Sequence, residues 1–170
     1  MKLIKEFNIV ILFSLIFCSF STSLLAQAPS LYVKAFRYIK GQYKGERLYV
    51  SDTIIHPAFA NFSKEVSLEW GKNEYKTLKY LDSVDRELAF FKEKTNTFNQ
   101  LNTNEKDPSK IFFFSEIFKN MIIVEVFKSK THRAFTITSQ ASFNTSTQYL
   151  LIFDSRKHVK KCYRIEVQYD

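Results

Sequence analysis

The sequence predicts an α+β fold in which N-terminal helices pack on one face of a curved antiparallel sheet formed mainly by the C-terminal half. Three observations favour this class. Apolar residues recur at helical spacing in residues 29–40 and 74–93. Short apolar or alternating runs follow from residue 111 onward, as is typical of strands. Only three glycines occur in 170 residues, which disfavours a β-sandwich with many tight turns.

An export signal is predicted for residues 1–26. Two lysines precede an apolar run over residues 9–20, and the segment 24–28 then supplies the small residues Ala26 and Ala28, where a signal peptidase would cut. Cleavage after Ala26 leaves residues 27–170, which we interpret as a single α+β domain. The domain is therefore expected to be periplasmic or secreted.

The N-terminus has two alternative interpretations, an uncleaved membrane anchor and a lipoprotein. An anchor needs about 20 apolar residues, whereas Ser14 and Cys18 interrupt the shorter run found here. Lipid attachment at Cys18 normally needs a small preceding residue, and Phe17 stands there. We expect no stable membrane span after signal cleavage, with the lipoprotein as the alternative.

The domain begins with a helix and a short strand. Residues 29–40 start with Pro-Ser and carry apolar side chains at helical spacing. Residues 47–51 are a strand candidate because Tyr49 and Val50 favour extended structure. Residues 58–72 are ambiguous, since their apolar side chains fit a helical period and, toward the end, an alternating one.

The next element is a helix over residues 74–93. Asp82 and Arg86 stand four residues apart on its expected solvent side and can form an ion pair. Its expected buried face is apolar and consists of Leu78, Leu81, Val84, Leu88 and Phe91. Residues 95–110 are polar and contain a proline, so we expect a long surface loop.

The remaining elements are predicted strands. The run at 120–127 is apolar enough for a central strand buried on both faces. A hairpin around residues 154–158 is expected to join the last two strands. The other predicted strands cover residues 111–114, 134–138, 149–153 and 159–169.

The last predicted strand alternates in polarity. Its expected apolar side is made of Val159, Tyr163, Ile165, Val167 and Tyr169, with Lys161 as the only departure. His158, Lys160, Cys162 and Arg164 fall on the expected polar side.

Helices followed by antiparallel strands resemble the cone-shaped roll of nuclear-transport-factor-like (NTF2-like) and cystatin-like domains. The resemblance concerns the order of elements in residues 27–170. Such folds host both enzymes and binding proteins, so the resemblance implies a fold and no particular function.

Composition restricts the partners. The chain carries a net charge of +8, and loss of Lys2, Lys5 and Glu6 with the signal leaves +7. This balance favours anionic ligands, although nucleic acid is not an expected partner of an exported protein. Clustered glycines that cradle phosphates are absent from the sequence, and we expect no cofactor. Cys162 is the only cysteine after residue 26, which excludes an internal disulfide.

The most informative acidic residue is Glu125, because it interrupts an otherwise apolar predicted strand. A buried carboxylate needs hydrogen-bonding partners or a raised pKa, and functional sites often contain one. An exposed Glu125 on an edge strand would look the same in the sequence. We treat Glu125 as a ligand-binding candidate and assign no catalytic residue.

Cys162 is a candidate reactive thiol, because the flanking Lys160 and Arg164 are expected to lower its pKa. The alternative is an incidental, partly exposed thiol. His158 is too distant for a catalytic dyad with Cys162, since four strand residues span about 13 Å. The three histidines, His56, His132 and His158, lack metal-ligand spacing, and no metal site is predicted.

Two basic clusters, at residues 128–133 and 156–161, surround predicted turns. If both turns lie at one end of the sheet, the clusters form a rim that binds an anionic ligand or a protein partner. The alternative is two separate solvated turns. The basic ligand-binding candidates are Lys130, Arg133, Arg156, Lys160 and Arg164.

The chain resembles small uncharacterised exported proteins of Bacteroidetes bacteria in three features. These are the Ala26-Gln27 junction, a composition rich in Lys, Asn and Phe, and the C-terminal strand pattern. The likeness covers about the last sixty residues and carries over no catalytic residue. The leading hypothesis is an exported, non-catalytic domain that binds a ligand or partner. The alternatives are a small hydrolase-like enzyme with a polar pocket around Glu125 and an inhibitor or immunity-type protein.

Overall fold

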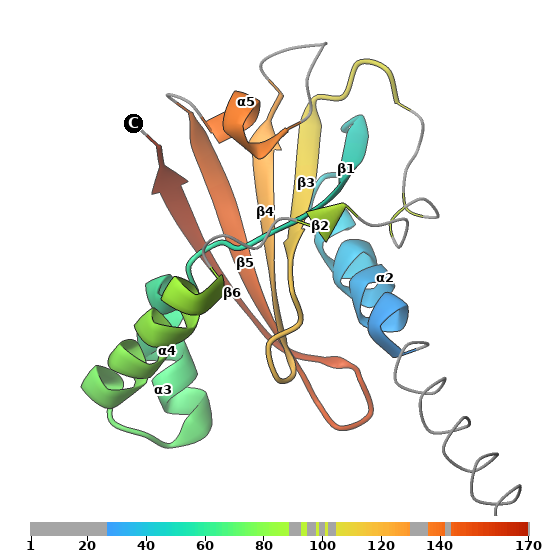
Figure 1. Cartoon of the computed structure of the whole chain (residues 1–170). Helices are drawn as coiled ribbons and strands as arrows, with labels where there is room; N and C mark the ends of the chain where they lie inside the picture. Colours follow the sequence, from blue (N-terminus) through green and yellow to red (C-terminus); the bar gives the residue numbers. More distant parts are fainter. Residues whose placement is uncertain are drawn as a thin grey trace, which may run out of the picture.

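The computed structural model describes residues 27–88, 93–94, 98, 101, 105–129, 136–141 and 144–169 (Figure 1). The predicted export signal and two of the predicted anion-binding residues, Lys130 and Arg133, lie outside these described residues.

The described chain forms one open sheet in the order β2-β1-β3-β4-β5-β6. Four of its pairings are antiparallel, while β1 and β3 run parallel. A parallel pair needs a long crossover connection, and the helices between β1 and β3 supply it. The strands are β1 Leu48–Ile55, β2 Glu93–Lys94, β3 Lys110–Ser115, β4 Met121–Lys128, β5 Thr145–Phe153 and β6 Val159–Gln168. The predicted α+β class is confirmed, with a mixed sheet.

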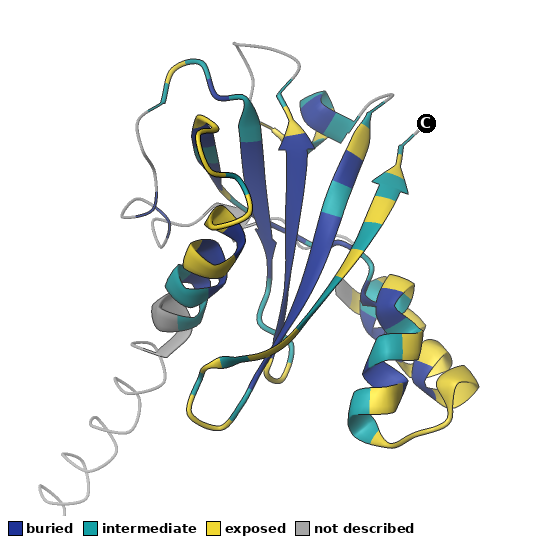
Figure 2. Cartoon of the chain, turned by 180° about the vertical axis from the view of Figure 1, so that it is seen from behind, coloured by how far each residue is buried: buried dark blue, intermediate teal, exposed yellow. Residues whose placement is uncertain are grey.

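Helices cover both faces of this sheet (Figures 1 and 2). They are α2 Gln27–Lys40, the short 3-10 helix η1 Phe59–Phe62, α3 Ser63–Trp70, α4 Glu74–Leu88 and α5 Ile137–Ala141. Successive side chains of a strand point to opposite faces of the sheet. Figure 2 shows that β4 is buried along almost its whole length, so both of its faces are covered. Ile122 and Val124 belong to the cluster under α2, whereas Met121 and Ile123 pack with η1, α3 and α4. The expectation that helices lie on one face was therefore wrong.

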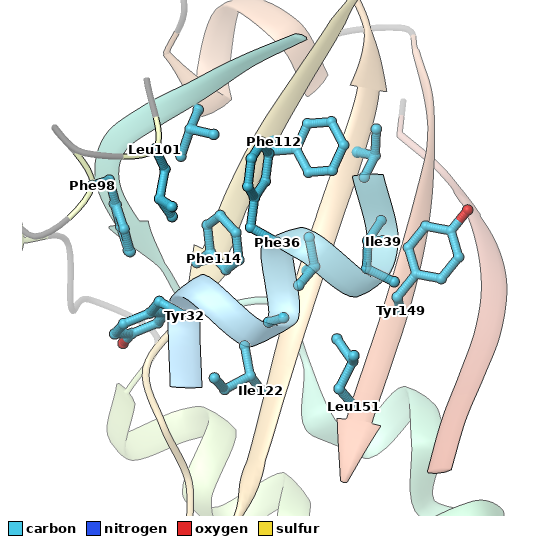
Figure 3. Packing of buried hydrophobic residues seen from close by; sticks show 14 of the residues in the cluster. Tyr32, Phe36, Ile39, Phe98, Leu101, Phe112, Phe114, Ile122, Tyr149 and Leu151 are labelled. Carbon is cyan, nitrogen blue, oxygen red and sulfur yellow. The ribbon is translucent and has the colours of Figure 1, made fainter. Parts of the chain in front are cut away.

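The core under α2 is aromatic (Figure 3). Tyr32 and Phe36 of α2 meet Phe114 and Phe112 of β3 edge to face, with ring centroids 5.7 Å and 5.5 Å apart. Phe98 is buried in the same cluster, as is Leu101. The segment 95–110 is therefore not simply a surface loop, because its few apolar side chains fill the core beside α2.

The ambiguous segment before residue 72 is helical and ends at Gly71. Gly71 has φ +60°, and the N–H of Lys72 donates to Ser67 O at 2.9 Å, which closes the C-terminus of α3. Phe59, Phe62 and Val66 are fully buried against β4 and β5.

Helix α4 differs from its prediction in two ways. Leu78 is 40% exposed, whereas Thr77 is buried and its hydroxyl donates to Asn73 O at 3.0 Å, so the buried polar group has a partner. The predicted end at residue 93 was wrong, since Glu93 belongs to β2. Leu81 and Val84 are buried as predicted, and the Asp82–Arg86 ion pair is confirmed.

The strand predicted at residues 134–138 was also wrong. Residues Ile137–Ala141 form the short helix α5. Thr136 explains its start, because its hydroxyl accepts the N–H of Ser139 at 3.3 Å, as an N-cap residue does.

The predicted alternation along β6 is broken by a β-bulge. Ile152 pairs with Lys161, but Phe153 pairs with Val159, so one extra residue, Lys160, enters β6. Val159 consequently packs on the α2 side of the sheet, whereas Lys160 and Lys161 both pair with Glu69 of α3. Val159 and Lys160 therefore each lie on the side of the sheet opposite to the predicted one.

Candidate functional site

A pocket of about 450 Å³ lies between α2 and the β5–β6 hairpin. Helix α2 contributes Lys34, Arg37 and Tyr38, and the hairpin contributes His158 and Val159. The pocket thus combines three basic side chains with an aromatic ring and an aliphatic side chain.

Helical geometry explains why α2 presents these three residues together. Positions 34, 37 and 38 are three and four residues apart, so they share one face of the helix. The other face carries Tyr32, Ala35, Phe36 and Ile39, which are buried in the core. Tyr38 is 47% exposed and remains accessible to a ligand.

The hairpin is held in place by its own polar groups and by α2. The N–H of His158 donates to Asp154 Oδ1 at 2.8 Å, and Lys157 has φ +62°. Lys34 Nζ donates to the carbonyl oxygen of Lys157 at 2.8 Å and bridges helix and hairpin. This contact fixes one wall of the pocket relative to the other.

The electrostatics of the pocket favour an anion. Lys34 and Arg37 are cationic, and none of the five lining residues is acidic. The neighbouring carboxylate, Asp154, is engaged with His158, whose Nδ1 lies 3.6 Å from Asp154 Oδ2. The backbone hydrogen bond from His158 lowers the pKa of Asp154, so this carboxylate stays ionised beside the histidine.

Glu125, a predicted ligand-binding residue, is buried in the sheet and only 1% exposed. Its Oε1 accepts hydrogen bonds from Ser146 Oγ at 2.5 Å, Tyr169 Oη at 2.6 Å and Gln148 Nε2 at 3.2 Å. Burial, and to a smaller extent the carboxylate of Glu125, raises the pKa of Tyr169. Three donors on β5 and at the end of β6 therefore account for a carboxylate in a central strand.

Of the first basic cluster, the structure describes only Lys128 and Ser129. The register of β4 and β5 pairs Phe127 with Ser146 and Met121 with Ile152. Lys128, the start of the first cluster, therefore lies at the opposite end of the sheet from the hairpin at 154–158. The described start of the first cluster therefore gives no support to a shared end, while residues 130–133 lie outside the described part of the chain.

The other predicted basic residues separate as well. Arg156 is exposed in the hairpin beside the pocket. Lys160 pairs with Glu69 on the opposite face of the sheet, and hydrogen bonds from Lys160 and Lys161 lower the pKa of Glu69. Arg164 pairs with Glu166 at 2.9 Å. Of the predicted basic ligand-binding residues that the structure describes, only Arg156 therefore lies in the hairpin beside the pocket.

Cys162 is a partly buried thiol that packs against the core under α2. Burial raises its pKa, which is the opposite of the effect expected from Lys160 and Arg164. The bulge explains part of the error, because it turns Lys160 to the other side of the sheet.

A partly buried His–Asp pair, which the sequence does not reveal, joins the segment before η1 to α4. His56 Nε2 lies 2.9 Å from Asp85 Oδ1, and the carboxylate also accepts the N–H groups of Phe59 and Ala60 at 3.0 Å and 2.8 Å. Asp85 thus provides hydrogen-bond acceptors for the backbone N–H groups at the start of η1. No group of three potential metal ligands occurs among the described residues.

Sequence reasoning missed Lys34, Arg37 and Tyr38. A signal existed, since these residues form a polar and aromatic stripe on a predicted helix. Only the tertiary arrangement shows that this stripe faces the β5–β6 hairpin.

The chain matches no protein-family model, no curated protein and no solved structure. None of the described helices is both long and apolar enough to span a membrane.

Proposed function

We propose that this protein is an exported, non-catalytic binding domain whose pocket between α2 and the β5–β6 hairpin takes a small anionic ligand with an apolar or aromatic body. The pocket itself carries this proposal, because it combines Lys34, Arg37 and His158 with Tyr38 and Val159 in about 450 Å³. Its volume falls within the range of small-molecule sites.

The chemistry divides the ligand into two parts. Lys34 and Arg37 supply charge-assisted donors for a carboxylate, sulfate or phosphate group. Tyr38 and Val159 offer apolar area to the body of the ligand. Because the pocket is open to solvent, salt screens the ionic part and binding should weaken as ionic strength rises.

The hydrolase alternative depended on a polar pocket around Glu125. A general acid or base must come within hydrogen-bond distance of its substrate. Glu125 is enclosed and its Oε1 already accepts three hydrogen bonds. The observed surroundings of Glu125 therefore favour a structural role.

Calorimetric titration with benzoate tests the proposal, with benzyl alcohol as the neutral comparison. We expect benzoate to bind more tightly than benzyl alcohol. Arg37→Gln should weaken benzoate binding about tenfold, the equivalent of a lost charge-assisted hydrogen bond. Lys44→Gln is the matched control, because it removes the same charge from an exposed residue that does not line the pocket. Equal effects of the two substitutions would contradict a localised site.

Export is tested separately by the intact mass of the protein recovered from a periplasmic fraction. The proposal predicts a chain that starts at Gln27. A chain carrying lipid at Cys18 would support the lipoprotein alternative. Recovery of the full chain with Met1 in the cytoplasm would contradict export.

A further inference from the structure

An aromatic cage lies on the side of the sheet opposite the pocket. Three rings surround the ammonium group of Lys119, with Nζ 4.2 Å from the ring centroid of Trp70, 5.0 Å from that of Tyr80 and 5.4 Å from that of Phe118. Each distance is within about 6 Å, the range of a cation–π interaction.

The rings come from three elements and contact one another. Trp70 ends α3, Tyr80 belongs to α4, and Phe118 lies in the turn between β3 and β4. The centroids of Trp70 and Tyr80 are 6.0 Å apart, and those of Tyr80 and Phe118 are 6.3 Å apart. Phe118 also contacts the buried Phe59 at 5.5 Å, which anchors this part of the cage to the core.

The backbone of Lys119 is unusual. It has φ +56°, a left-handed conformation that favours glycine or asparagine over lysine. Phe118 and Met121 exchange backbone hydrogen bonds at 3.0 Å and 2.9 Å, so Lys119 occupies a tight turn. A lysine is thus held at a strained position with its ammonium group among three rings.

The cage remains accessible at the surface. Tyr80 is 44% exposed, and Lys119 itself is exposed. The side chain of Lys119 is flexible and unbranched, so it can leave the cage without rearrangement of the helices. The rings are fixed by the fold, whereas the cation is removable.

The geometry points to a binding site for a quaternary ammonium group, which Lys119 occupies as an internal competitor. A trimethylammonium group presents a larger apolar surface to three rings than a primary ammonium and is less strongly hydrated, so the same cage favours it. The ligand class is a choline-type cation, free or as part of a lipid headgroup.

The surrounding charges explain why the competitor matters. Lys72 Nζ lies 5.5 Å from the Trp70 ring, and the neighbouring Glu69 is paired with Lys160 and Lys161. An incoming cation therefore meets unfavourable charge while Lys119 stays in place. Removal of Lys119 should increase affinity, which is the distinctive expectation of this inference.

Titration of the full chain with choline chloride tests the site by tryptophan fluorescence. Trp70 is the only tryptophan in the sequence, so the signal reports this cage directly. Lys119→Gly removes the competitor and suits the left-handed backbone. We expect it to bind choline at least about tenfold more tightly than the unmodified protein, since three ring contacts no longer need to be displaced.

Two comparisons separate the cage from general effects. Lys79→Ala removes the same charge from a lysine over the single ring of Tyr75 and should leave choline affinity unchanged. The neutral isostere 3,3-dimethylbutan-1-ol should bind at least about tenfold more weakly than choline to Lys119→Gly, because it lacks the charge. Lys119→Asn, which also tolerates the backbone, provides a second variant if Lys119→Gly folds poorly, as judged by circular dichroism.

The outcomes are decisive in either direction. Tighter binding of choline to Lys119→Gly or Lys119→Asn, with no change in Lys79→Ala, supports the cage. Vesicles of phosphatidylcholine then distinguish a headgroup from a free cation, according to whether the variant sediments with them. The absence of saturable choline binding to both folded variants, or equal binding of the neutral isostere, would overturn the inference.

Discussion

Replacement of Glu125 by alanine tests whether this buried carboxylate stabilises the fold. In the native protein its Oε1 accepts hydrogen bonds from Ser146, Gln148 and Tyr169. Ser146 and Gln148 are almost fully buried, so their donors would lose a partner away from water. An unsatisfied buried donor costs about 1–3 kcal/mol, and relief of the carboxylate's own burial offsets part of the total. We expect Glu125→Ala to lower the free energy of unfolding by about 3 kcal/mol.

A double-mutant cycle with Tyr169→Phe isolates one of these hydrogen bonds. Tyr169→Phe alone should cost about 1 kcal/mol, because Oε1 keeps two other donors. In the Glu125→Ala background the same change should cost almost nothing, which gives a coupling of about 1 kcal/mol.

Urea unfolding, followed by circular dichroism and by Trp70 fluorescence, measures these values. Glu87→Ala on the exposed surface of α4 is the control and should change stability by less than about 0.5 kcal/mol. A loss below about 1 kcal/mol for Glu125→Ala, or additive effects of Glu125→Ala and Tyr169→Phe, would refute the structural role of the carboxylate.

Further tests concern the ionisation of two tyrosines, the reactivity of Cys162 and the backbone of Lys157. Burial is the main cause that raises the pKa values of Tyr149 and Tyr169, so the unfolded chain loses these two protons at lower pH than the folded protein does. The free energy of unfolding, measured with urea, should therefore fall as pH rises above about 10. The fall should be less steep in Tyr169→Phe, which lacks one of the two phenols. Cys162, whose pKa burial raises, should react with a disulfide reagent more slowly in the native protein than in urea, and equal rates would contradict its packing. Lys157→Gly should raise the free energy of unfolding by about 0.5 kcal/mol by relieving φ +62°, and a lowered melting temperature would argue against strain there.

The elements predicted correctly are those in which apolar residues follow a single helical or strand spacing. The apolar run at β4 and the alternating end of β6 predict strands, and both are present. Helix α2 is confirmed because its apolar residues follow a single helical face. At α5 the same reasoning failed, because a five-residue helix capped by Thr136 is too short to show a helical period.

The layers of the fold depended on tertiary contacts that no local pattern encodes. The parallel pairing of β1 with β3 follows from the crossover through η1, α3 and α4. That crossover places α3 and α4 on the face opposite α2, which the order of elements alone does not reveal.

The candidate site was predicted only in part. The basic hairpin was recognised, but its partner surface on α2 was not, because long-range packing brings Lys34 to the Lys157 carbonyl. The bulge in β6 moved Lys160 away from the predicted rim, since one inserted residue reverses the side on which a side chain lies. Glu125 was singled out as a ligand-binding candidate, but its burial and its three hydrogen-bond donors favour a structural role, which the sequence does not reveal.

Chemical-shift mapping of the full chain during a benzoate titration tests the proposed binding pocket most directly. The account predicts saturable shifts at the backbone amides of Lys34, Arg37, Tyr38, His158 and Val159, and no comparable change at Lys128 at the far end of the sheet. Saturable shifts centred elsewhere, or no saturable shifts at these five residues, would contradict it.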